Sequence, residues 1–202
     1  MWAEDMTAPT NQLPTLEDLN ALSKRRQMIY AIRCAQRAEP LYAEKRPDRD
    51  RALYIHSRLE TALAYLATGT LEKNSTEIQF SSYSDYGIQS VDFAAMAAED
   101  FYNEATDPEY GLEFAEYDEA TPAHRVEWAA HFSVLTAYDT HLPLEEARRN
   151  ERVALSATLA DYDLLLSSLG DDLETLGGLW HEEPLDSFER RLSLHKSILR
   201  AS

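Results

Sequence analysis

The chain has 202 residues, with 19 lysines and arginines against 36 aspartates and glutamates, and a formal net charge of −17 at pH 7. This acid excess argues against a nucleic-acid-binding protein, because affinity for DNA and RNA rests on basic contacts to phosphates. The hydrophobic content of 44% excludes a disordered acidic tail and is sufficient for one core.

The spacing of apolar residues predicts an all-α protein, a single-domain multi-helix bundle of about seven helices. The six glycines are few, and the prolines fall mainly between the periodic segments, as is typical of helical proteins. We expect residues 1–14 to be a flexible N-terminal segment and residues 15–202 to form the single domain. The predicted helices cover residues 15–22, 24–44, 49–67, 86–105, 122–138, 144–169 and 184–199.

Several residues mark where these helices begin and end. Thr15 followed by Asp18 resembles a capping box, and Thr121 before Pro122 is an N-cap followed by proline at the first helical position. Gly69 is expected to close the third helix, whereas Pro40 is expected to kink or end the second. In the helix over 144–169, the residues predicted to face inward are Val153, Leu155, Leu159, Tyr162 and Leu166.

The sequence gives no sign of secretion or membrane insertion. Glu4 and Asp5 lie where a signal peptide would carry basic residues, and the longest apolar runs are far shorter than a bilayer span of about 20 residues. We therefore expect a cytoplasmic protein that contacts no membrane. Cys34 is the only cysteine, so no intramolecular disulfide is possible, and its apolar neighbours predict that it is buried.

Charge is distributed unevenly along the chain. Residues 74–124 contain 12 acidic residues and no lysine or arginine, whereas residues 24–58 contain ten basic residues against four acidic ones. Tyrosines are interleaved with the acids, and tyrosine offers a large contact area at a low entropy cost. This pattern is typical of a docking surface for a basic partner, although a solvated acidic face with half-buried tyrosines would give the same pattern.

The sequence therefore predicts a partner-binding surface and a basic protein partner, a toxin or effector domain. Its predicted members are the acids and tyrosines of one stretch, namely Asp92, Glu99, Asp100, Tyr102, Glu104, Asp107, Glu109, Tyr110, Glu113, Glu116, Tyr117, Asp118 and Glu119.

Motifs for catalysis and metal binding are scarce, so we expect no enzyme activity, cofactor or metal. No phosphate-binding glycine loop or nucleophile elbow is present. The alternative is a metal-dependent helical-bundle enzyme that uses His56, His124 and His131, because His124, Glu127 and His131 share one face of a predicted helix. A further alternative is a structural homo-oligomer, in which the apolar stripe of residues 185–199 forms an interface between copies.

Two resemblances accompany these patterns. The residues 23–44 and 51–66, a Ser- and Asp-rich loop ending at Gly87, and the opening of the helix at 144–151 resemble the YjaG-like family of uncharacterised all-helical bacterial proteins. That resemblance implies the fold but no activity. The stretch from Cys34 to Tyr42 also resembles helical immunity proteins encoded beside bacterial polymorphic toxins, which implies a small, acidic, non-enzymatic inhibitor that covers the active surface of a toxin domain.

Overall fold

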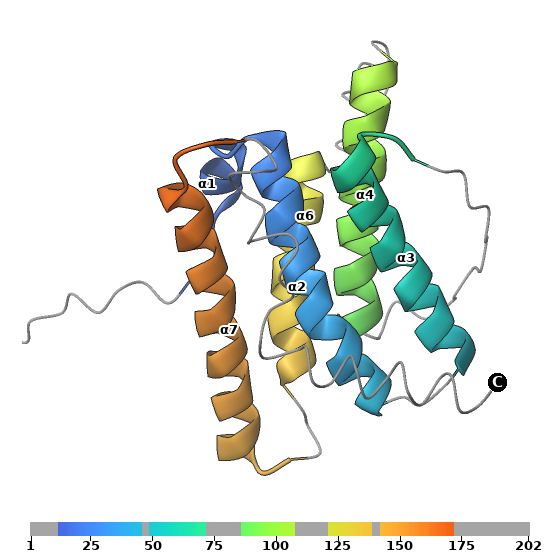
Figure 1. Ribbon diagram of the computed structural model, residues 1–202. Coiled ribbons are helices and arrows are strands. Elements are labelled where there is room, and N and C mark those ends of the chain that lie inside the picture. The colour runs from blue at the N-terminus through green and yellow to red at the C-terminus, as the bar shows by residue number, and fades with distance from the viewer. Residues whose placement is uncertain (1–11, 46–48, 72–85, 108–120, 139–141, 172–202) are drawn as a thin grey trace, which may run out of the picture.

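A computed structural model describes residues 12–45, 49–71, 86–107, 121–138 and 142–171, and every regular element in these ranges is an α-helix. The all-α prediction is therefore confirmed for the part of the chain that is described. The predicted helix over 184–199 and most of the N-terminal segment 1–14 lie outside the described residues. The helices are α1 (Leu16–Asn20), α2 (Lys24–Lys45), α3 (Arg49–Thr68), α4 (Tyr86–Thr106), α6 (Pro122–Ala137) and α7 (Leu144–Ser167) (Figure 1).

Side-chain caps set the beginnings of two helices. The Thr15 side chain accepts a hydrogen bond from the backbone N–H of Asp18, and the Asp18 carboxylate accepts one from the backbone N–H of Thr15, at 2.9 Å. Thr121 and His124 make the same reciprocal arrangement at the start of α6, where Pro122 occupies the first turn. These contacts satisfy amide groups that have no partner within the helix, and they confirm both predicted starts.

The predicted ends of α2 and α3 had different outcomes. Gly69 follows α3 with φ = 69°, a left-handed conformation that glycine adopts without steric cost, so the predicted closure is confirmed. Pro40 does not end α2, which continues to Lys45. The predicted range of residues 24–44 is therefore confirmed, and of the two effects expected of Pro40 the end of the helix does not occur.

Helix α2 is the centre of the bundle. Every residue from 27 to 40 is buried, and α2 packs against α3, α4, α6 and α7. In Figure 1, α2 lies between α7 on one side and α3 and α4 on the other. Because all faces of this part of the helix are covered, residues 27–40 have no solvent-exposed side, and their polar side chains must find partners inside the protein.

Small residues line the contact between α4 and α6. Ala94, Ala97 and Ala129 are completely buried, and small side chains at a contact permit a short distance between helix axes. At this short range hydroxyl groups reach backbone carbonyls: Ser90 Oγ donates to the Ala129 carbonyl, and Ser133 Oγ donates to the Cys34 carbonyl on α2, both at 2.7 Å.

The orientation of α7 differs from the predicted one. Val153 and Leu166, which were expected to face inward, are 61% and 50% exposed. The buried residues are instead Ala147, Thr158, Asp161 and Leu165. The other three predicted residues, Leu155, Leu159 and Tyr162, are partly buried, and Tyr162 packs against the core. The prediction is therefore right in part: the buried face is rotated from the apolar one because two of its four buried positions carry polar side chains. Among the described residues, no helix combines the length and apolar character that a membrane span requires.

Candidate functional site

The predicted acidic surface begins with two carboxylates of α4 that meet one arginine of α3. Arg58 Nε lies 3.1 Å from Asp92 Oδ1, and Arg58 Nη1 lies 2.6 Å from Glu99 Oε1. The Tyr54 hydroxyl also donates to Asp92, at 2.8 Å. Burial raises the pKa of the Asp92 carboxyl despite these hydrogen bonds. Both acids therefore connect α3 to α4 within the fold.

The next two acids of α4 also pair with basic residues of neighbouring helices. Asp100 Oδ2 lies 3.1 Å from Arg125 Nε on α6, and Glu104 Oε2 lies 2.6 Å from Lys24 Nζ on α2. The Lys24 ammonium also lies 5.5 Å from the centre of the Phe101 ring, within cation–π range. The acids of α4 thus hold α4 against its three neighbours.

The remaining predicted surface residues divide into two groups. Tyr102 is half-buried and Asp107 is exposed at the end of α4. The others lie outside the described residues: Glu109, Tyr110, Glu113, Glu116, Tyr117, Asp118 and Glu119.

Partly exposed aromatic rings follow the contact between α4 and α6. Phe93 lies between Trp128 and Phe132, with ring centroids 4.9 and 5.6 Å apart, and Tyr86 stacks on Phe132 at 5.7 Å. Tyr86 is 46% exposed, and the other three rings are partly exposed. We call Tyr86, Phe93, Trp128 and Phe132 the aromatic strip. Sequence analysis missed it because the α6 rings lie outside the acidic stretch, although Trp128 and Phe132 have helical spacing.

The three histidines of the predicted metal site are not brought together. His56 Nδ1 lies 3.6 Å from Glu39 Oε1, His124 caps α6, and the His131 ring lies edge-on against Phe132 at 5.5 Å. Within the described ranges, no group of three histidine, cysteine, aspartate or glutamate side chains is arranged to hold a metal ion. The shared face predicted for His124, Glu127 and His131 therefore borders the aromatic strip without forming such a group.

A charged cluster missed by sequence analysis lies between α2 and α7. Asp161 is buried and lies 2.8 Å from Arg33 Nε, and it also pairs with Arg37 Nη1. The i, i+4 spacing of the two arginines places both on one face of α2. Tyr30 continues this face and packs edge-on against Tyr162 of α7, at 5.9 Å between ring centroids. The cluster joins the central helix to the last described helix.

Cys34 lies on the same face of α2 and is completely buried, as predicted. Burial raises the pKa of its thiol to about 12, and the thiolate is the reactive form of cysteine. In the native protein at pH 8, we therefore expect Ellman's reagent to react at least about a hundredfold more slowly with Cys34 than with free cysteine. In urea the rates should become equal. Rapid labelling of the native protein would contradict the packing described for α2.

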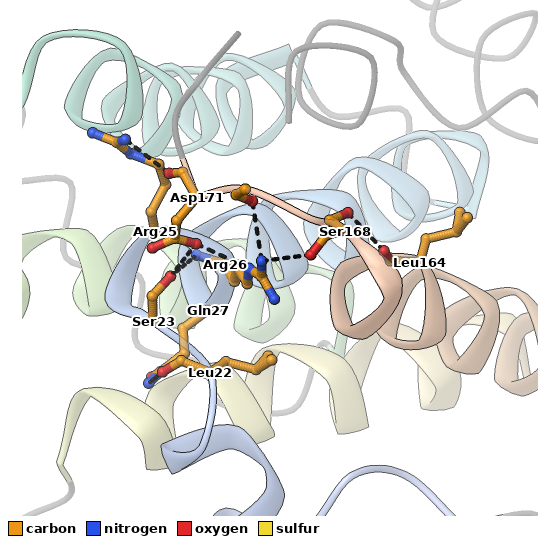
Figure 2. Close-up of polar contacts among 9 residues, drawn as sticks. Leu22, Ser23, Arg25, Arg26, Gln27, Leu164, Ser168 and Asp171 are labelled. Carbon is orange, nitrogen blue, oxygen red and sulfur yellow. Dashed lines mark hydrogen bonds and ion pairs between the residues drawn. The ribbon is translucent and has the colours of Figure 1, made fainter. Parts of the chain in front are cut away.

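The end of α7 is fixed to the beginning of α2 (Figure 2). Arg26 donates to the Ser168 and Gly170 carbonyls at 2.9 and 3.0 Å, and its Nε donates to Asp171 Oδ1 at 2.9 Å. Ser23 Oγ donates to the same carboxylate oxygen at 2.7 Å. Arg26 thus holds the residues that follow α7, whereas the Leu164 carbonyl in the last turn of this helix accepts hydrogen bonds from the Ser167 and Ser168 hydroxyls.

Comparison of the chain with protein-family models, with curated proteins and with solved structures finds no match.

Proposed function

We propose that this chain is a non-enzymatic binding protein whose acidic surface docks on a basic protein. The observation that carries the proposal is that many basic residues form ion pairs within the fold. At least five of the 19 contact carboxylates of other helices, namely Lys24, Arg33, Arg37, Arg58 and Arg125, and Arg26 contacts Asp171 beyond the end of α7. These six side chains are held within the fold and do not gather into a basic patch, and the net charge of −17 makes the field around the protein negative on the whole.

Helices α4 and α6 carry five acids against the single base Arg125, namely Asp92, Glu99, Asp100, Glu104 and Glu127. The first four form ion pairs with Arg58, Arg125 and Lys24, so the acidic surface proposed here extends from this paired group to Glu127 and to the acids that follow α4. The acids from 107 to 119 lie between these two helices in the sequence and add no base. A negative surface of this kind accelerates encounter with a positively charged protein and disfavours other partners.

The partner that fits best is a basic toxin or effector domain, which this protein would neutralise by covering its active surface. The acid excess supports this role, and the resemblance of residues 34–42 to helical immunity proteins agrees with it. Inhibition by coverage needs no catalytic group in the inhibitor. It needs a rigid surface, and the interhelical ion pairs of α4 provide one.

The proposal is tested with the full chain as bait in a lysate of its source cell and against the product of the adjacent gene. At low ionic strength we expect retention of one basic protein, and at high salt we expect it to be lost, because salt screens the attraction between exposed charges. Mass spectrometry identifies the retained protein, and calorimetry then measures its dissociation constant at several salt concentrations.

Two charge variants distinguish binding through a specific acidic surface from attraction to the net charge of the protein. Neutralising Asp107, Glu109, Glu113 and Glu116 to the corresponding amides should weaken binding about tenfold. The control neutralises the same number of acids on α7, Glu145, Glu146, Glu151 and Asp163, and should have a much smaller effect. A dissociation constant that is indifferent to salt and to the first variant would show that the assignment of this surface is wrong.

A structural homo-oligomer is a second candidate, favoured by one observation. Val153 and Leu164 share one outer side of α7, because they are 11 positions apart, and they are 61% and 49% exposed. Large apolar side chains exposed on one side of a helix are typical of an interface. The predicted interface over 185–199 lies outside the described residues. The metal-dependent enzyme has no such support, because its three histidines lie apart.

A further inference from the structure

The aromatic strip is more than a continuation of the core. Its four rings lie in one row along the contact between α4 and α6, and all of them keep part of their surface in solvent. Tyrosine, tryptophan and phenylalanine are enriched in the central part of protein interfaces. Burying aromatic area is one of the largest gains available to a helical protein, so a row of rings left partly exposed is a candidate contact surface.

The charges beside the strip are negative. Arg125 is the only basic residue of α4 and α6, and it is paired with Asp100 at one end of the row. Glu127 precedes Trp128 on α6 and is partly exposed, and in the described structure it has no basic side chain within ion-pair distance. Glu127 shares a face of α6 with His124 and His131, whose rings lie 6.1 and 5.5 Å from those of Trp128 and Phe132. A ligand that reaches from the strip across this face would therefore meet both aromatic rings and the Glu127 carboxylate.

We propose that the aromatic strip and Glu127 bind arginine side chains of the partner. This inference rests on the proposed function and names the chemistry of the partner's contact surface. A guanidinium group stacks on aromatic rings and also donates two parallel hydrogen bonds to one carboxylate. A lysine ammonium is a strongly hydrated point charge and forms neither the planar stack nor the paired hydrogen bonds. The strip should therefore prefer arginine to lysine.

The test uses polyarginine and polylysine peptides of equal length as probes. Trp2 and Trp180 are replaced by phenylalanine in the full chain, so that Trp128 is the only tryptophan and reports contact with the strip through its fluorescence. We expect polyarginine to change the Trp128 emission and to bind about fivefold or more tightly than polylysine at the same ionic strength.

Two variants and two matched controls locate the binding. Tyr86→Ala and Glu127→Gln should each weaken polyarginine binding about threefold to fivefold. Leu164→Ala removes a side chain of similar exposure from α7, 49% against 46% for Tyr86, and Glu145→Gln removes an exposed charge from the same helix. Both controls should change the dissociation constant less than twofold. Thermal melts by circular dichroism check that all four variants are folded.

The outcomes separate this inference from the function on which it rests. If polylysine binds as tightly as polyarginine, or if Tyr86→Ala and Glu127→Gln bind as the parent does, the strip is not an arginine site. Failure of both peptides to bind also overturns it. The docking function itself is overturned by a different result, the salt-independent binding of the native partner described above.

Discussion

Replacement of Asp161 by asparagine is expected to lower the free energy of unfolding by about 3–5 kcal/mol. The change keeps the size of the side chain but removes the charge that Arg33 and Arg37 contact in the interior. Two arginine side chains that are almost fully buried then lose a carboxylate, and removal of one partner from a buried ion pair is costly because burial has already removed the water. Urea denaturation followed by circular dichroism at neutral pH measures the loss.

Asp163 provides the control for this experiment. It lies two residues further along α7 and is exposed, so Asp163→Asn should change the free energy of unfolding by less than about 0.5 kcal/mol. Equal effects of the two substitutions on the free energy of unfolding would mean that stability depends only on the total charge of α7 and not on the position of each acid. The cluster between α2 and α7 would then have no special role in stability.

The three consecutive leucines of α7 give the second large effect. Leu165 is completely buried, so Leu165→Ala should cost about 2–5 kcal/mol of unfolding free energy, through lost burial and the cavity that remains. Leu164 and Leu166 are about half exposed, and their replacement by alanine should each cost less than about 1 kcal/mol. The three variants are compared under the same urea conditions.

This series also tests the orientation of α7. If Leu166→Ala were the most costly of the three substitutions, the helix would face the bundle as its apolar pattern alone predicts. If Leu165→Ala is the most costly, the polar positions Thr158 and Asp161 belong to the buried face together with Leu165.

Local signals in the sequence were sufficient to predict most of the helices. The caps at Thr15 and Thr121 and the closing Gly69 depend on neighbouring residues only, so a reader of the sequence can find them without knowing the fold. Proline is a weaker signal. At Pro40 the tertiary packing around the buried residues 27–40 outweighs the lost backbone hydrogen bond, and the helix continues.

The missed features depend on residues that are far apart in the sequence. An aspartate on a helix usually faces solvent, and the sequence around Asp161 does not indicate otherwise. Its partners Arg33 and Arg37 are 128 and 124 positions earlier in the chain. The acids of α4 also pair with residues that are distant in the sequence. The sequence reports their number correctly, but the choice between an interhelical ion pair and a docking contact depends on Lys24, Arg58 and Arg125, which a linear charge count places elsewhere.

The same separation bears on how the chain folds as it is synthesised. Helix α2 leaves the ribosome before α7. Its Arg33 and Arg37 can pair with Asp161 only after more than one hundred further residues have been added. Native contacts between segments so far apart slow folding, and exposed apolar surface favours aggregation in the interval. A nascent chain that ends before α7 therefore leaves uncovered the face of α2 that α7 covers, including Tyr30 and both arginines, and a partly apolar face of this kind is what chaperones bind.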